Sequence, residues 1–328
     1  MLVRPPVMLG EAAAFRVALD LIQRTARCDA PALILGETGT GKELAARAIH
    51  YGSARRPAPF VPLNCGAVPE TLFESELFGA ERGAFTDARH SRSGLVAAAE
   101  GGTLFLDELD SLPLRAQVSL LRFLQDLVYR PVGGTRECQG NVRVIAAASP
   151  RLRELLKTGA FRDDLAFRLN VLEIEMPPLR DRPGDPRLLA EHYVARYVEQ
   201  HSMTPRQLHP RSIEWMAAHS WPGNVRELDN LVRRALLLSD EALLRLCPAA
   251  VQAAPELPLR DDDDEAPCTR FNDARDRAMQ SFERQYLEKL MRVAAGNVTH
   301  AARLAGKERR LLGRMLKKHG LGHGTVAH

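Results

Sequence analysis

The 328-residue sequence lacks the features that mark membrane and secreted proteins. No apolar run is long enough to span a membrane, and the first six residues contain no apolar region of a signal peptide. The five cysteines show no paired spacing, so we expect free thiols and neither disulfides nor a metal site formed by them. These absences predict a cytoplasmic protein that makes no contact with membranes.

The charge is small overall and uneven along the chain. The formal net charge is +4, but the segment from Cys268 to the end holds 13 Lys and Arg against 5 Asp and Glu. The rest of the chain is therefore slightly acidic. A basic C-terminal end suggests a nucleic-acid partner.

Apolar, strand-like runs alternate with helical patterns from residue 1 to about residue 180. Strands connected by helices are typical of a parallel sheet in an α/β domain. The five runs that we predict to be strands are Ala32–Leu35, Phe60–Leu63, Thr103–Leu106, Val142–Ala146 and Val171–Met176.

Residues 181–250 show no strand signal and predict a small helical domain, with helices over 187–201, 210–219 and 224–239. Residues 251–268 are acidic and rich in proline, without apolar periodicity, and predict a flexible linker. Residues 269–328 are helical again in pattern. The chain contains no internal repeat.

A phosphate-binding loop is predicted after the first strand. The stretch from Gly36 to Lys42 has the pattern G-x-x-x-x-G-K and precedes a predicted helix over 43–49. Backbone N–H groups at the helix start would face phosphate oxygens, and Lys42 would add a positive charge. Glu43 stands where most such loops carry a Ser or Thr that helps to hold Mg²⁺. The candidate nucleotide-binding residues of the loop are Gly36, Glu37, Thr38, Gly39, Thr40, Gly41, Lys42 and Glu43.

Two adjacent carboxylates, Asp107 and Glu108, follow the third predicted strand. Because neighbouring side chains of a strand point to opposite faces, Asp107 can approach Mg²⁺ while Glu108 faces a water that attacks the γ-phosphate. Two solvated acidic residues that merely end a strand would give the same sequence. That alternative does not account for the phosphate-binding loop earlier in the chain. Arg162 and Arg168 carry charge suited to a γ-phosphate, although their spacing alone favours an ordinary exposed helix.

Six motifs occur in one order along the chain. They are Gly36–Glu43, Glu74–Gly79, Gly83–Ala88, Thr103–Glu108, Phe161–Arg168 and Trp221–Leu228. With these motifs, residues from about 7 to 321 resemble the AAA+ bacterial enhancer-binding proteins, the activators of sigma-54 RNA polymerase. Glu43 is the residue that this family usually carries after the lysine, so the resemblance explains its position.

The resemblance implies ATP and Mg²⁺ as the bound groups. Lys42 and Asp107 would serve ATP, with Asp107 as the metal ligand, and Glu108 would polarise the attacking water. Asn64 matches the asparagine that can hold this glutamate in an inactive pose.

The resemblance also assigns three arginines. Arg162 and Arg168 match the arginine fingers, which reach the nucleotide of a neighbouring subunit in a ring that is usually a hexamer. Arg226 matches the second sensor on the helical lid. The stretch around it also reads as a helix start after a Pro-Gly turn, with Asn224 as a candidate N-cap.

A glycine loop that carries one aromatic residue is the candidate contact with sigma-54. A phenylalanine packed inside an ordinary turn would also explain this pattern. In the family that the chain resembles, however, the corresponding loop touches sigma-54 and moves with ATP hydrolysis. The family loop reads Gly-Ala-Phe-Thr-Gly-Ala, and here an aspartate replaces its second glycine, so we expect contact that is weakened or differently regulated. The loop residues are Gly83, Ala84, Phe85, Thr86, Asp87 and Ala88.

Other positions depart from the family pattern. Ala148 and Ser149 stand where the first sensor usually has Thr-Asn, and the Glu and Arg usual near Ala97 and Pro131 are both missing. These departures predict ATP hydrolysis that is slow or depends on a partner.

Residues 296–319 read as helix, turn and helix, with Leu312 and Leu316 forming one apolar stripe. An ordinary basic helical hairpin would have a similar sequence pattern. The segment nevertheless resembles the Fis-type helix-turn-helix found at the C-terminus of proteins of this family. Gly313 should weaken the second helix by about 1 kcal/mol relative to alanine. A helix over 282–293 is expected to support dimerisation, and two half-sites in enhancer DNA are the expected target. The candidate DNA-binding residues are Arg309, Arg310, Arg314, Lys317 and Lys318.

The predicted core begins within about ten residues of Met1, without room for the receiver or ligand-sensing domain of a typical member. We therefore expect control by a separate regulatory protein, by expression level or by hetero-oligomers with a similar subunit, besides homo-oligomers from dimer to hexamer.

The leading hypothesis is an ATP-dependent, DNA-binding activator that remodels sigma-54 RNA polymerase holoenzyme. The alternative is a DNA-binding regulator that works by assembly with a partner, in which nucleotide serves assembly only, and Asp87 and Ala148 support it. A different AAA+ machine, such as a replication factor, is disfavoured by the loop at 83–88.

Overall fold

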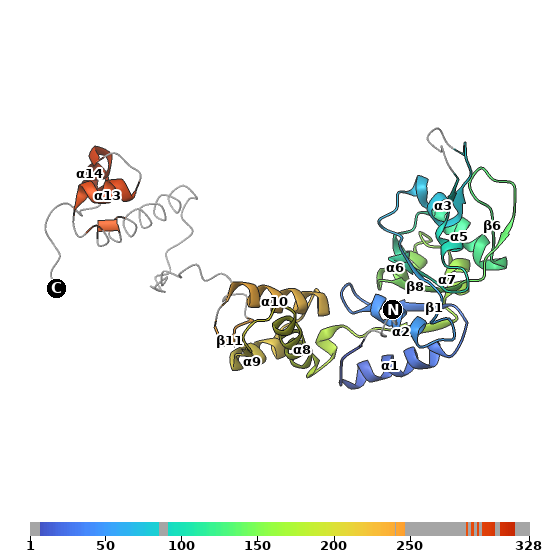
Figure 1. Cartoon of the computed structure of the whole chain (residues 1–328), viewed down its shortest axis with the longest axis horizontal. Helices are drawn as coiled ribbons and strands as arrows, with labels where there is room; N and C mark the ends of the chain where they lie inside the picture. Colours follow the sequence, from blue (N-terminus) through green and yellow to red (C-terminus); the bar gives the residue numbers. More distant parts are fainter. Residues whose placement is uncertain are drawn as a thin grey trace. The chain divides into compact units, whose positions relative to one another are not determined.

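The computed structural model describes residues 7–84, 91–239, 241–246, 287, 290–291, 294, 297–305 and 309–318. The chain divides into two compact units, Met1–Pro255 and Glu256–His328. The first unit holds an α/β part and a helical part, which Figure 1 colours from blue to yellow. The predicted linker at 251–268 lies outside the described residues.

A five-stranded parallel sheet is the centre of the α/β part, as predicted. β1 has its predicted bounds, and the other strands differ from prediction by one or two residues at an end. The order of the strands places β1, which leads into the phosphate-binding loop, between β8 and β9. In spatial order the strands are β2 (Phe60–Asn64), β5 (Thr103–Asp107), β8 (Arg143–Ala148), β1 (Ala32–Leu35) and β9 (Leu172–Glu175).

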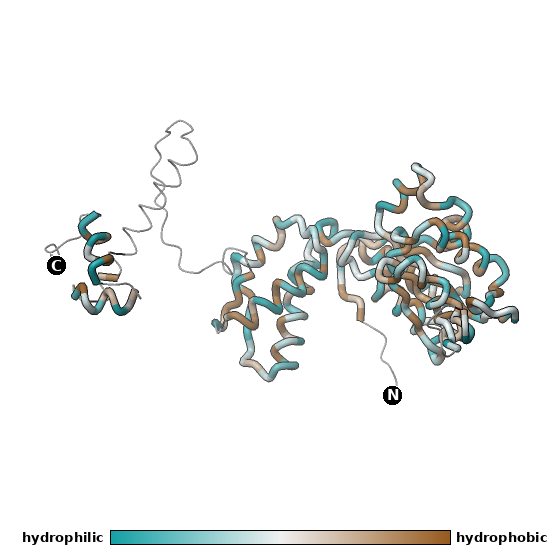
Figure 2. The backbone as a smooth tube through the Cα atoms, turned by 90° about the horizontal axis from the view of Figure 1, so that it is seen from above, coloured by the Kyte–Doolittle hydropathy of each residue, from teal (hydrophilic) through white to brown (hydrophobic). Residues whose placement is uncertain are grey.

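Helices cover both faces of this sheet, because successive strand residues point to opposite sides. Ile34 faces the core shared with α1 (Ala13–Ala26) and α2 (Lys42–Tyr51). Leu33 and Leu35 face the core shared with α3 (Glu70–Phe78), α5 (Leu114–Asp126), α6 (Arg151–Lys157) and α7 (Asp163–Leu169). Figure 2 shows the hydrophobic stretches gathered in the interior of this part.

Short elements complete the α/β part. β3 (Gly79–Ala80) and β4 (Arg92–Ser93) pair antiparallel and enclose the candidate sigma-54 loop between them. β6 (Val128–Tyr129) and β7 (Cys138–Gln139) form a second antiparallel pair. The helical segments α4 (Leu95–Ala98) and η1 (Leu109–Ser111) flank β5.

The helical part of the first unit comprises η2 (Leu179–Asp181), α8 (Asp185–Gln200), α9 (Pro210–Ala218) and α10 (Asn224–Leu238), and Figure 1 shows these helices as one bundle. Its core surrounds the fully buried Trp221. The prediction that this part has no strands was wrong, since β10 (Gln207–Leu208) and β11 (Leu243–Leu244) pair in parallel. Two-residue strands are too short to show an alternating pattern.

A buried ion pair joins the start of α8 to the N-terminal segment. Asp185 accepts backbone N–H bonds from Glu11 and Ala12 at 2.7 and 3.1 Å, and receives the Arg182 guanidinium at 2.8 Å. Arg182 also stacks 3.6 Å from the centre of the Phe15 ring on α1. Both charges are therefore fully paired, as burial requires.

The second unit contains α13 (Val298–Leu304) and α14 (Arg309–Lys318). Asn297 caps α13 by accepting the N–H groups of Thr299 and His300. Leu312 and Leu316 are both buried in one core with Leu287, which confirms the predicted apolar stripe. Within the described residues, no helix has the length and apolarity to cross a membrane.

Candidate nucleotide site

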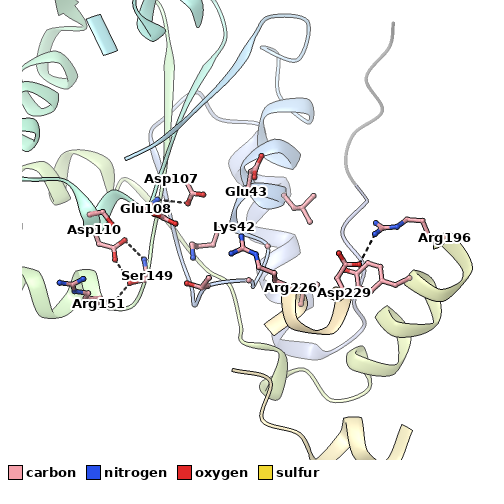
Figure 3. A pocket seen from close by; sticks show the side chains of 17 residues that line it. Lys42, Glu43, Asp107, Glu108, Asp110, Ser149, Arg151, Arg196, Arg226 and Asp229 are labelled. Atoms are coloured by element: carbon pink, nitrogen blue, oxygen red, sulfur yellow. Dashed lines mark hydrogen bonds and ion pairs between the residues drawn. The ribbon is translucent and has the colours of Figure 1, made fainter. Parts of the chain in front are cut away.

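A cleft of about 540 Å³ lies at the carboxyl ends of β1 and β5, and α8 and α10 form its other wall (Figure 3). This is where parallel α/β sheets usually bind ligands. The cleft brings together predicted residues from three distant parts of the sequence. The predicted residues that line it are Thr38, Gly39, Gly41, Lys42, Glu43, Asp107, Glu108 and Arg226.

Two glycines of the phosphate-binding loop adopt a backbone conformation with positive φ. Gly39 and Gly41 have φ of 82° and 97°, values that L side chains rarely adopt. Thr40 is buried and its hydroxyl donates to the Glu37 carbonyl at 2.8 Å. The Lys42 ammonium donates to the carbonyls of Gly36 and Glu37 at 2.7 and 3.1 Å. Burial lowers the pKa of Lys42, and the carboxylates of the cleft oppose that shift.

Asp107 and Glu108 both line the cleft, but not through strand alternation as predicted. β5 ends at Asp107, and Glu108 turns away with φ of 53° in the left-handed region. One Asp107 oxygen accepts the Glu108 N–H at 2.9 Å. Burial raises the pKa of Asp107, and nearby Lys42 partly offsets this shift. The two carboxylates thus point in different directions because the backbone turns at Glu108. Two adjacent acidic residues in a sequence do not predict such a turn.

Asn64 lies opposite Asp107, because β2 pairs with β5 in that register. Its side-chain oxygen accepts the N–H groups of Gly66 and Ala67 at 2.9 and 3.0 Å. A Cβ on Gly66 would lie 2.5 Å from a Glu108 oxygen, so the glutamate packs against this turn. Asn64 and Glu108 therefore meet at one turn, and the predicted restraining role of Asn64 stays a prediction.

The lid side of the site corrects one prediction. Asn224 does not cap α10, because it is the first residue of the helix and Gly223 occupies the N-cap position. Asn224 is fully buried with φ of 52°. Arg226, two residues further along α10, is exposed and lines the cleft, and its role as a sensor stays a prediction.

Arg162 and Arg168 do not line this cleft within the described residues. Arg162 is exposed at the start of α7 and pairs with Asp164 at 2.7 Å. Arg168 donates to the carbonyls of Leu124 and Gln125 at 3.0 and 2.9 Å. Both residues are exposed at the surface.

The cleft contains functional groups that the sequence did not reveal. Asp110 accepts the Ser149 hydroxyl at 2.6 Å and its N–H at 3.0 Å. Sequence reasoning noticed Ser149 only as a departure, and no motif marked Asp110. On the lid wall, Arg196 contacts Asp229 at 3.3 Å and lies 5.0 Å from the Tyr193 ring centre. Burial raises the pKa of Tyr193 to about 12, so it stays neutral.

Two predicted contact regions contribute no described residue to the lining of the cleft. Of the candidate sigma-54 loop, the structure describes Gly83, with φ of 84°, and Ala84, whereas residues 85–88 lie outside the described residues. The five candidate DNA-binding residues on α14 are all exposed. In the described part of the chain, no cluster of His, Cys, Asp and Glu has the makeup of a metal site.

Comparison with known proteins identifies relatives of the whole chain. Residues 8–175 match the family described as the sigma-54 interaction domain, and residues 180–252 match the AAA+ ATPase lid domain. The transcriptional regulatory protein GlrR of Escherichia coli is 42% identical over 318 residues, which cover 97% of this chain and 67% of GlrR. The sigma54-dependent transcriptional activator SfnR of Pseudomonas putida is 40% identical over 299 residues, which cover 88% of this chain and 82% of SfnR.

A solved structure extends the likeness to the fold. NtrX from Brucella abortus in complex with ATP superposes with a TM-score of 0.68 and 33% identity, covering 98% of this chain and 70% of NtrX. The same protein has also been crystallised with ADP. This chain spans between 56% and 82% of the length of its curated relatives.

Proposed function

Because this chain belongs to the family of bacterial enhancer-binding proteins, with their sigma-54 interaction AAA+ domain and lid, we propose that it hydrolyses ATP to remodel sigma-54 RNA polymerase holoenzyme. The observation that carries this proposal is the convergence of Lys42, Asp107, Glu108 and Arg226 on one cleft. A cation, two divergent carboxylates and a lid arginine are the groups that phosphoryl transfer to water requires.

The donor set of the cleft fits ATP with Mg²⁺. The first turn of α2 offers backbone N–H groups to phosphate oxygens, and Lys42 adds a charge that can leave its two carbonyl partners for them. Asp107 would hold the metal with the oxygen that does not accept the Glu108 N–H. When bound, Mg²⁺ would neutralise charge on the phosphates.

Glu108 is proposed as the general base. Its left-handed backbone directs the carboxylate away from Asp107 toward the turn of Asn64 and Gly66. It would accept a proton from the attacking water there. Asn64 is proposed to restrain Glu108 from that turn until the subunit is engaged.

Arg162 and Arg168 are proposed to act on the nucleotide of a neighbouring subunit. Their surface positions on α7 and their distance from their own cleft support a role between subunits. An arginine presented in trans stabilises charge that develops in phosphoryl transfer. The proposal therefore includes a ring of subunits, either of one chain or mixed with a similar one, under a separate regulatory protein.

The loop at 83–88 is proposed to contact sigma-54, since it lies in the segment that connects β3 and β4 of the sigma-54 interaction domain. For DNA, we propose that α13 and α14 act as a helix-turn-helix on enhancer sites. The exposed row of basic residues on α14, opposite buried Leu312 and Leu316, supports this assignment.

A second candidate function keeps DNA binding and nucleotide-dependent assembly but lacks remodelling. The observation that favours it is the pairing of Ser149 with Asp110. A serine already engaged with a carboxylate has less freedom to report the γ-phosphate. The substitution at Asp87 points the same way.

The decisive experiment compares the wild-type chain with Glu108→Gln on a sigma-54 promoter. We expect ATP hydrolysis to fall by roughly 10²–10⁴-fold, the scale of a lost general base. Transcription should fall with it, while DNA binding stays unchanged. Promoter output that survives the loss of hydrolysis would reject remodelling and support the second candidate.

A further inference from the structure

We propose that Glu37, Asn224 and Arg180 form a latch between the phosphate-binding loop and the lid, and that this latch sets nucleotide affinity by holding Arg226 at the cleft. The inference rests on the proposed nucleotide site and adds positioning residues to it. Its basis is a set of contacts between residues far apart in the sequence.

Asn224 is the buried centre of the latch. Its Nδ2 group donates to the Glu37 carboxylate and to the Thr38 carbonyl, both at 3.1 Å. Its Oδ1 atom accepts the Leu179 N–H at 2.8 Å. One side chain thus joins the phosphate-binding loop, the segment that leads into the lid, and the first residue of α10. A buried amide with all these bonds made is costly to displace.

Glu37 and Arg180 form the outer edge of the latch. The guanidinium donates to both carboxylate oxygens of Glu37, at 2.9 and 2.6 Å. The bond from Arg180 holds the pKa of Glu37 below its ordinary value, so the carboxylate is ionised at neutral pH. Glu37 does not line the cleft among the described residues, although Thr38 and Gly39 beside it do. The side chain of Glu37 therefore serves the lid and not the phosphates.

The two backbones also touch directly. The Val225 N–H donates to the Gly39 carbonyl at 3.0 Å. A Cβ on Gly39 would lie 2.3 Å from the Gly223 carbonyl oxygen, so only glycine permits this approach. Because Arg226 follows Val225, its place at the cleft depends on the loop that would hold the phosphates. A nucleotide that orders one of these elements would order the other.

A loosened latch would leave Arg226 mobile and the loop less preorganised. Nucleotide binding would then include the cost of closing the lid, which lowers the apparent affinity. The chemistry at Glu108 would proceed normally once the nucleotide is bound. The latch thus predicts a higher Kd and KM with kcat nearly unchanged, whereas general damage to the fold would lower kcat too.

The test measures binding of a fluorescent ADP derivative to the full-length chain. Asn224→Asp removes both Nδ2 donors and adds a charge beside Glu37, and we expect its Kd to rise by about tenfold, within the usual range of couplings between sites. Glu37→Gln and Arg180→Gln should each raise the Kd by roughly threefold, and the double variant no further, because both remove one interaction. Hydrogen exchange of the Val225 amide should become faster in all of them.

Glu191→Gln is the matched control, since it breaks the exposed pair of Arg187 and Glu191 on α8 at 2.8 Å, and neither residue lines the cleft. Its Kd should equal that of the wild type. A wild-type Kd in Asn224→Asp, with an unchanged melting temperature, would overturn the latch. If that variant does not fold, additive effects of Glu37→Gln and Arg180→Gln would overturn it. A wild-type chain that binds no ADP would overturn the nucleotide site itself.

Discussion

Gln117 on α5 has a fully buried side-chain amide. This amide connects the segment after Glu108 with the backbone of Arg162. Its Nε2 group donates to the carbonyls of Leu112 and Ala160 at 2.9 and 3.1 Å. Its Oε1 atom accepts the Arg162 N–H at 2.9 Å. The segment that follows Glu108 and the backbone of the proposed arginine finger are thus held by one side chain.

The variant Gln117→Met keeps the length of this side chain and removes its hydrogen bonds. Each buried backbone group left unpaired costs about 1–3 kcal/mol, so the segment before α7 should shift and Arg162 with it. We expect kcat for ATP to fall by roughly tenfold with KM unchanged, since the finger acts in trans on bound nucleotide. The control is Gln125→Met, an exposed change on the same helix. Equal kcat values for both variants and the wild type would contradict the positioning role.

At the scale of single residues, sequence patterns indicate which residues form the site better than they indicate the backbone conformation of those residues. The pattern around Lys42 predicted the loop, and in the structure Gly39 and Gly41 have positive φ. The geometry of Glu108 and Asn224 was missed, because both adopt a positive φ, which is uncommon for any residue other than glycine even though Asn shows it more often than most. Such conformations are imposed by tertiary contacts, and no local pattern encodes them.

Gly94 lies directly after β4, at the base of the candidate sigma-54 loop, where the backbone packs too closely for a side chain. A Cβ at this position would lie 2.3 to 2.5 Å from backbone atoms of Gly79, Phe78 and Leu77. Val132 braces the same base, since its N–H donates to the Gly79 carbonyl at 2.9 Å. The pairing of β3 with β4 at the base of the loop therefore depends on this close packing.

Gly94→Ala should force β4 away from β3, because backbone atoms cannot move aside as flexible side chains do. We expect a loss of about 1–3 kcal/mol in stability and at least a tenfold loss of sigma-54-dependent transcription. ATP hydrolysis should stay within about twofold of the wild type, because β4 does not line the cleft. Ser93→Ala, an exposed change beside it, provides the control. Full transcription with Gly94→Ala would refute a role of the loop base.

The main elements follow from the sequence because apolar runs and helical patterns are local signals. The far wall of the cleft is different, since Tyr193 and Arg196 lie on α8 and Asp229 on α10, with no motif to connect them. Only the packing of α8 against α10 brings them to the phosphate-binding loop. The alanine-rich end of β8 likewise gave no sign that Ser149 meets Asp110.

Over the whole molecule, the proposed activities belong to separate compact units. The cleft and the loop base lie in Met1–Pro255, whereas α13 and α14 lie in Glu256–His328. ATP hydrolysis and DNA binding should therefore respond independently to mutation. On α14, a shallow hollow is lined by Arg310, Gly313, Arg314 and Lys317, and its positive charge comes from the two arginines and the lysine. Leu312 is buried on the opposite side of the helix.

Arg314→Ala tests this separation. If Arg314 contacts a phosphate, its loss should weaken DNA binding alike on all sequences and reduce the slope of log K against log salt by about 1. ATP hydrolysis measured without DNA should be unchanged, because the cleft lies in the other unit. Arg24→Ala is the matched control, an exposed arginine paired with Asp20 on α1. An unchanged salt slope with Arg314→Ala would remove α14 from the DNA interface, and a loss confined to one DNA sequence would assign Arg314 to a base edge.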